Sequence, residues 1–295
     1  MLHPHTVRAN VDPPKLGALE DAKQLHKHGQ KAFGEGDRNA AVYQLNQAVE
    51  AYQALNADHR KEIAQIYTLL SRCYSFMRAD HQAITFGKQA VVLAEEVYGE
   101  IHPEVARAYR ELGHVYTVRE ENTLSLNYHQ KSLEIVTKYF GKNHIEVARC
   151  LKSLGNVYHN LRDSVRAENY YYYAQNMARE LEGPESELVA MVYHNLGIHF
   201  FDHHNWKLAI QNWRKAMEIS RKVRGEAHYI ITEQIMYIGE ALVADGEYDL
   251  ADSYFNRGVL RLAPDFDTTQ TYGIPSLAKG EYQARNCAPE VEGSG

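Results

Sequence analysis

Apolar residues recur along this chain at the spacing of amphipathic helices. Before the polar break LRDS at 161–164, one such stripe consists of Ala148, Leu151, Leu154, Val157 and Tyr158. After the break, the segment VRAENYYYYAQNMARELEG at 165–183 is predicted to form a second helix. A similar break, ADGEY at 244–248, separates two helical stretches nearer the C-terminus. The pattern therefore predicts helical hairpins.

The hairpins recur with a period of 42 residues. One small residue marks the first helix of every repeat, at Gly29, Ser71, Gly113, Gly155, Gly197 and Gly239. Two more columns of small residues follow it 12 and 19 residues later: Ala41, Ala83, Ser125, Ala167, Ala209 and Ala251, then Ala48, Ala90, Ser132, Ala174, Ala216 and Gly258. Helices that cross at about 8–10 Å leave no room for a large side chain at the crossing. Six stacked hairpins in a single register are therefore predicted.

Glycine and proline mark the junctions between repeats. Gly99, Gly141, Gly183 and Gly225 recur at the same period, and a helix C-terminus favours a left-handed residue at such a position. Proline follows in two of the junctions, within EIHPEVA and PESELVA, as is usual where a new helix begins. Each glycine is therefore predicted to end the second helix of its repeat.

These residues resemble the tetratricopeptide repeat family over roughly residues 17–264. The period exceeds the usual length of about 34 residues in that family, and the linker G-x-x-H-P-x-V-A at 99–106 is similar to that of the kinesin-light-chain subtype. The resemblance implies an all-α fold, a right-handed superhelical α-solenoid of six tandem helix hairpins. Residues 1–16 are predicted to be a flexible arm, and residues 265–295 a tail that is largely disordered or docked.

Four adjacent tyrosines, Tyr170 to Tyr173, lie within the predicted helix at 165–183. A helix turns by about 100° per residue, so four neighbours cannot form one flat stacking surface. Tyr170 and Tyr171 occupy positions that are often aromatic in other repeats, and we expect them to pack between helices. Tyr172 and Tyr173 occupy positions that hold Lys, Arg or Gln elsewhere, and we expect them to be exposed.

Composition narrows the functional classes. The net charge of −6 argues against general nucleic-acid binding, which needs a basic surface. No apolar stretch is long enough to span a membrane, and Cys73, Cys150 and Cys287 form neither a disulfide framework nor a zinc pattern. The chain contains no phosphate-binding glycine loop, HExxH helix or nucleophile elbow. We therefore expect a cytoplasmic protein that is not an enzyme and has no cofactor or metal ion.

The resemblance implies that four positions of each first helix line the concave inner face. In the second to fourth repeats these positions hold five cations and no carboxylate: Arg72, Arg107, Arg110, Arg149 and Lys152. Glu111 stands beside them and is expected to neutralise part of their charge. The rest of the predicted peptide-binding set consists of His114, Asn156, His159, His194, Asn195, Ile198 and Phe201. The alternative interpretation is that the arginines are ordinary surface residues paired with glutamates on neighbouring turns.

We expect a non-catalytic adaptor or scaffold that binds an extended acidic segment of another protein in a concave basic groove. Arginine forks suit carboxylates, and the apolar end of the predicted set suits an aromatic or aliphatic anchor. Lys152, Asn156 and Asn195 match part of the family's clamp for a C-terminal carboxylate. Glu233 and Tyr237 stand where that clamp has further cations, so the clamp itself is not expected here.

Two other functions stay open at this stage. One is a structural or assembly protein that self-associates through its convex face or through the ends of the solenoid. The other is a sensor for a small signalling peptide. Both use the same repeat fold, so the repeats alone do not separate them from an adaptor.

Overall fold

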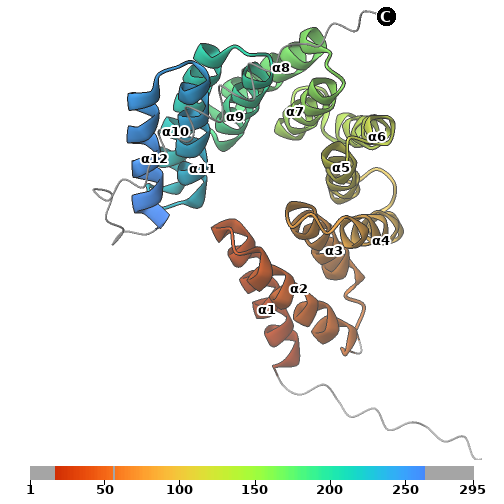
Figure 1. The fold of residues 1–295 in the computed structure, drawn as a ribbon. Helices are drawn as coiled ribbons and strands as arrows, with labels where there is room; N and C mark the ends of the chain where they lie inside the picture. The colour runs from red at the N-terminus through yellow and green to blue at the C-terminus, as the bar shows by residue number, and fades with distance from the viewer. Residues whose placement is uncertain (1–16, 56, 263–295) are drawn as a thin grey trace, which may run out of the picture. The chain divides into compact units, whose positions relative to one another are not determined.

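The computed structural model describes residues 17–55 and 57–262, and every regular element in these ranges is an α-helix (Figure 1). The first helices of the repeats are α1 (Ala18–Glu35), α3 (Arg60–Phe76), α5 (Pro103–Val118), α7 (Ile145–Asn160), α9 (Glu187–Asp202) and α11 (Tyr229–Ala244). The second helices are α2 (Arg38–Gln53), α4 (Asp80–Tyr98), α6 (Asn122–Phe140), α8 (Ser164–Glu182), α10 (Trp206–Arg224) and α12 (Tyr248–Leu262). The predicted all-α repeat solenoid is confirmed. The predicted arm at 1–16 and tail at 265–295 lie outside the described residues.

The chain divides into two compact units, Met1–Tyr170 and Tyr171–Gly295, with the boundary inside α8. In the first unit α1 packs on α2, α3 on α4 and α5 on α6, and each of these hairpins also contacts the next first helix. In the second unit α9 packs on α10 and α11 on α12, and α10 contacts α11. Each unit therefore buries its apolar residues within and between consecutive hairpins. None of the described helices has the length and apolar character needed to cross a lipid bilayer.

The predicted columns of small residues are buried. All members of the two later columns are inaccessible to solvent or nearly so. In the first column, a β-carbon at Gly29 would lie 2.6 Å from Leu45 Cγ on the second helix. In the second repeat the glycine lies on the second helix instead. Gly87 of α4 faces Ser71 of α3, and a β-carbon at Gly87 would lie 2.9 Å from the Ser71 hydroxyl oxygen. One partner at each of these contacts must therefore be small.

The junction glycines have positive φ angles, but three of them do not adopt the left-handed helical conformation that the sequence predicts. Gly99, Gly141 and Gly225 have φ of 79°, 85° and 84° with ψ of 163°, 177° and 159°. This extended mirror-image region is open to glycine and strained for other residues. Positive φ angles also occur in the turn between the two helices of each described hairpin, at Gly36, Arg78, Glu120, Arg162, His204 and Gly246. Sequence reasoning missed this second column because most of its members are not glycine.

The four tyrosines of α8 divide as predicted. Tyr171 is 1% exposed, whereas Tyr172 and Tyr173 are 42% and 66% exposed. Tyr170 is half-buried and stacks on Tyr158 with 5.2 Å between the ring centroids. The run therefore consists of two packed and two exposed side chains, as helical geometry requires.

Candidate functional site

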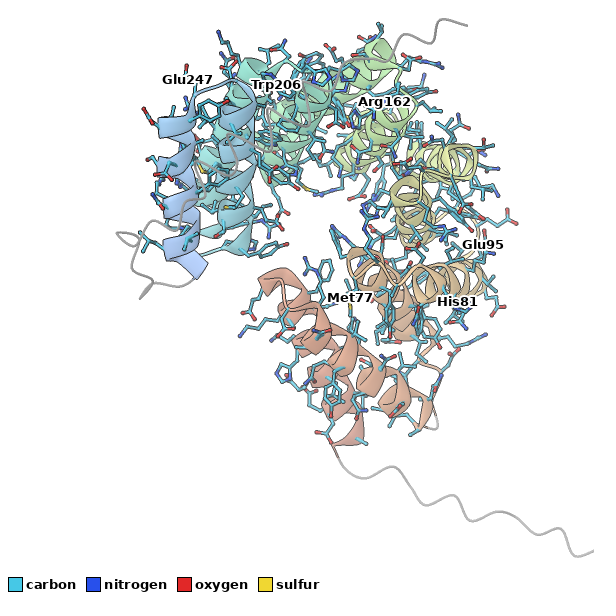
Figure 2. All side chains as sticks on the ribbon, viewed as in Figure 1. Met77, His81, Glu95, Arg162, Trp206 and Glu247 are labelled. Carbon is cyan, nitrogen blue, oxygen red and sulfur yellow. The ribbon has the colours of Figure 1, made fainter. Side chains whose placement is uncertain are left out.

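Three consecutive first helices of the first unit supply the predicted cations. Arg72 comes from α3, Arg107 and Arg110 from α5, and Arg149 and Lys152 from α7. Because the period is 42 residues, Arg107 and Arg149 occupy equivalent turns of their helices. Figure 2 shows nitrogen-bearing side chains on the side of α3, α5 and α7 that faces away from α4 and α6. We call these five residues the cationic cluster.

Carboxylates from neighbouring turns lie among the cations. Glu111 Oε2 is 3.6 Å from Arg72 Nε. Arg110 Nη1 donates a hydrogen bond of 2.7 Å to Glu146 Oε2, and Arg149 Nε lies 3.2 Å from the other oxygen of that carboxylate. Glu146 therefore connects the third repeat to the fourth.

The inner positions themselves hold no carboxylate, as the sequence indicates. The structure nevertheless agrees with the alternative interpretation, in which the arginines pair with glutamates on neighbouring turns. Glu104 Oε1 lies 3.3 Å from Arg107 Nη1, so each arginine of the cluster has a carboxylate partner. Glu104 and Glu146 lie in the first turn of α5 and of α7, one turn before the predicted inner positions. Acidic residues are favoured there because they interact with the positive end of the helix dipole. Five cations against Glu104, Glu111 and Glu146 leave an excess of two positive charges.

Glu111 is the carboxylate at the centre of the cluster, and its side chain is only 12% exposed. Burial alone would raise the pKa of Glu111, but the charges of Arg72 and Arg110 outweigh burial and lower it to about 2. Arg110 is itself largely buried between Glu111 and Glu146. Removing one member of such a buried network leaves the others uncompensated, so Arg110 and Glu111 have a structural role.

Lys152 and His114 each have a nitrogen atom without a hydrogen-bond partner among the described residues. Lys152 forms no ion pair or hydrogen bond with any described residue. Burial, assisted by the charges of Arg72 and Arg110, lowers the pKa of Lys152 to about 8. His114 Nδ1 is buried and has no hydrogen-bond partner in the described part of the chain, and burial lowers the pKa of this ring to about 4. Glu111 acts on Lys152 only at a distance, without a direct ion pair. An ammonium group in this position next to arginines suits an anionic ligand.

The remaining predicted residues divide between the two units. Asn156 and His159 follow Lys152 on α7 and are half-buried. The others lie on α9 in the second unit and are also half-buried: His194, Asn195, Ile198 and Phe201. Ile198 and Phe201 pack against the apolar core around Trp213. The predicted set therefore has members in each of the two units.

An aromatic group beside the cationic cluster was missed by sequence reasoning. Phe76, at the end of α3, is 49% exposed, and its ring centroid lies 6.1 Å from that of Phe33 and 6.0 Å from that of His114. The guanidinium carbons of Arg38 and Arg72 lie 4.9 Å and 5.9 Å from the centre of the Phe76 ring. Nothing in the sequence indicated that Phe76 would pack beside Phe33.

Comparison with known proteins identifies the repeat. Residues 104–180, from α5 into α8, match the tetratricopeptide repeat family, and the same 42-residue register extends on both sides of the match. Residues 104–180 are therefore tetratricopeptide repeats. No curated protein sequence matches it.

Several solved structures share the fold at low sequence identity. BtubC (BKLC) from P. vanneervenii superposes with a TM-score of 0.53 at 19% identity, covering 86% of this chain and 94% of that chain. A putative kinesin light chain with nearly identical repeats from Podosopora anserina has a TM-score of 0.50 at 15% identity, with 73% and 100% covered. A Rap protein complexed with competence and sporulation factor has a TM-score of 0.57 at 17% identity, with 83% and 77% covered. At these identities the similarities concern the fold alone.

Proposed function

We propose that this protein-interaction scaffold binds an extended acidic segment of a partner protein across α3, α5 and α7. The observation that carries the proposal is the excess positive charge of the cationic cluster, with the ammonium group of Lys152 not paired to any described residue. Arg72, Arg107 and Arg149 are only partly buried. A guanidinium group has five N–H donors, so each of these arginines can take a ligand carboxylate beside the glutamate that it already holds.

The exposed ring of Phe76 suggests that the acidic segment also carries an apolar side chain. Phe76 lies next to Arg72 of the cluster, and its other neighbours are Phe33, Arg38 and His114. An aromatic or aliphatic side chain placed on Phe76 would be buried beside the carboxylates of the same ligand. Apolar anchors of this kind usually supply most of the binding energy, whereas exposed ion pairs add selectivity.

Substitution of the partly exposed cations tests the proposal. Short acidic peptides are selected from a display library on the full chain, and their affinity is measured by fluorescence anisotropy. We expect Lys152→Gln to weaken binding about tenfold, the loss of one charge-assisted contact. Arg107→Glu combined with Arg149→Glu should abolish binding while circular dichroism stays helical. Lys88→Gln, an exposed cation on α4, is the matched control and should bind like the native chain.

The pH dependence of binding gives a second readout of the same contact. A ligand carboxylate raises the pKa of Lys152 above its value of about 8 in the free chain. The contribution of Lys152 is therefore complete below pH 8 and is lost as the pH rises through the raised pKa of the complex. The affinity of the Lys152→Gln chain should not show this decrease as the pH rises. Acidic peptides that bind all variants equally, or no acidic peptide selected at all, would contradict the proposal.

A further inference from the structure

The inner helices of the second unit have the opposite charge to those of the first. Helices α9 and α11 contain no lysine or arginine. Their charged residues are all carboxylates: Glu187, Asp202, Glu233 and Glu240. Glu187 is paired with Arg224 of α10. The middle of α11 therefore presents Glu233 and Glu240 without a cation on its own helix or on α9.

Glu240 has no counter-ion among the residues that the structure describes. It is exposed, and it forms neither an ion pair nor a hydrogen bond with any residue in the described ranges. Partial burial of the carboxyl group nevertheless raises its pKa, and no cation among the described residues opposes this effect. Glu233 lies two turns earlier on the same face of α11. A carboxylate at this position would be stabilised by an ion pair with a cationic ligand.

Aromatic rings fill the space between the two carboxylates. Tyr237 lies between Glu233 and Glu240 on α11, and its ring stacks on Trp213 of α10 with 5.2 Å between centroids and 19° between planes. The ring of His194 on α9 meets Tyr237 edge-on at 5.5 Å. These contacts hold the phenol ring firmly. Burial, together with the negative charges of Glu233 and Glu240, raises the pKa of Tyr237.

Apolar side chains continue this surface. The ring of Phe201 on α9 lies 5.7 Å from that of Trp213. Ile198 of α9 and Val243 of α11 are half-buried and pack on the same core. These partly exposed groups pack on the same buried core as Tyr237, and we call Glu233, Tyr237 and Glu240 with these neighbours the α11 face.

We propose that the α11 face binds a basic segment of a partner protein, in which arginine or lysine stands next to an aliphatic or aromatic side chain. A guanidinium group can pair with a carboxylate through two hydrogen bonds and stack on a fixed aromatic ring, and its methylene groups can cover apolar side chains. Glu240 with Tyr237 offers the first two contacts, and Ile198 with Phe201 offers the third. This site is independent of the proposed acidic ligand of the first unit and takes the opposite charge.

The two tryptophans of the chain give a local readout of this proposal. Trp206 and Trp213 are the only tryptophans, and both have ring contacts with Phe201. Random displayed peptides are selected on the full native chain, with the Glu233→Gln/Glu240→Gln chain used to remove peptides that do not depend on the two carboxylates. We expect the retained peptides to carry arginine or lysine next to leucine, isoleucine or phenylalanine. Synthetic versions that lack tryptophan should change the tryptophan emission of the native chain.

Matched variants test whether binding of the retained peptides depends on Glu233 and Glu240. The Glu233→Gln/Glu240→Gln chain should bind the retained peptides at least about tenfold more weakly than the native chain, as expected for the loss of charge-assisted contacts. Glu218→Gln, an exposed glutamate on α10 that pairs with Lys222, should bind like the native chain. Lys152→Gln should also leave this binding unchanged, which separates the α11 face from the site in the first unit. No carboxylate-dependent peptide, or retained peptides that are acidic or uncharged, would overturn the proposal.

Discussion

His129 occupies the position at which other repeats place a leucine, tryptophan or phenylalanine against the small residue of the first helix. It is 1% exposed, and its Nε2 lies 3.2 Å from the hydroxyl of Thr117. Its Nδ1 has no hydrogen-bond partner among the described residues. Burial, assisted by the charges of His114 and Arg110, lowers the pKa of His129 to about 3. The fold therefore depends on a neutral ring at this position.

Acid should destabilise the first unit through His129. Because the pKa in the folded chain lies below the ordinary value of 6.5, the stability is complete above pH 6.5 and is lost as the pH falls toward 3. Between about pH 7.5 and about pH 5, the native chain should lose roughly 2 kcal/mol of unfolding free energy that a His129→Leu chain retains. Urea unfolding followed by circular dichroism at both pH values measures the difference. Equal losses in the two chains would exclude the burial of His129 as the cause.

Each hairpin depends on the close approach of its two helices. A β-carbon at Gly197 of α9 would collide with the indole of Trp213 on α10. That indole is fixed, because its Nε1 donates a hydrogen bond of 3.1 Å to the carbonyl of His194. By contrast, a β-carbon at Gly34 of α1 would meet no atom within 4 Å. The two glycines therefore serve different purposes although both lie within helices.

Substitution by alanine should separate these two glycines. Gly197→Ala should lower the unfolding free energy by about 1–3 kcal/mol, because the indole must move in a close-packed core. Gly34→Ala should raise it by about 0.5–1 kcal/mol, because alanine restricts the unfolded chain and favours the helix. Urea unfolding measures both, and the emission of Trp213 should shift only in the first variant. A Gly197→Ala chain as stable as the native one would mean that the two helices do not need this contact.

The recurring histidines at the junctions cap the N-termini of the first helices. His102, His144 and His228 are N-caps, and the Nδ1 of each accepts a hydrogen bond from a backbone N–H in the first turn at 3.2, 3.2 and 3.3 Å. Ser186 stands at the same position of another repeat and accepts from a first-turn N–H with its hydroxyl. Satisfying these otherwise unpaired N–H groups typically contributes about 1 kcal/mol per cap. The histidines therefore need no metal ion or catalytic role to account for their period.

At the scale of the whole molecule, net charge and local charge have opposite signs. The chain carries a net charge of −6, which repels an acidic ligand at long range. The cationic cluster together with Glu104, Glu111 and Glu146 has an excess of two positive charges. Salt screens both effects, so the response of binding to salt shows which of them dominates.

We predict that salt weakens the binding of the acidic peptides to the first unit. Raising the ionic strength from about 0.05 M to about 0.5 M should lower their affinity about tenfold, because contact pairs with the arginines and Lys152 are screened. Fluorescence anisotropy titrations at the two ionic strengths measure this. Affinity that increases with salt would show that repulsion by the whole chain outweighs the cluster. A neutral peptide of the same length is the control and should be insensitive to salt.

The parts of the candidate site differed in how far they were predictable. That Arg107 and Arg149 occupy equivalent positions follows from the repeat period, which needs no knowledge of the packing. The pairing of Arg110 with Glu146 does not follow, because these residues are 36 positions apart and belong to different repeats. The exposed ring of Phe76 beside Arg72 depends on the same stacking of neighbouring hairpins. Contacts within one helix can be read from spacing, whereas contacts between repeats require their relative placement.

The amino-acid sequence alone determined the helices, their common register and the small residues at their crossings. It did so because the periodicity of a helix and the lack of space at a crossing restrict residue types wherever the hairpin occurs. The tertiary structure decided which charges remain available for a partner. Arg107 pairs with Glu104, and Arg149 with Glu146, within one helix. The approach of one repeat to the next adds the pairs Arg72–Glu111 and Arg110–Glu146. It leaves Lys152 and Glu240 without an ion pair to any described residue. Electrostatic pairing depends on distances of a few ångströms between segments far apart in the chain, and only the folded molecule sets those distances.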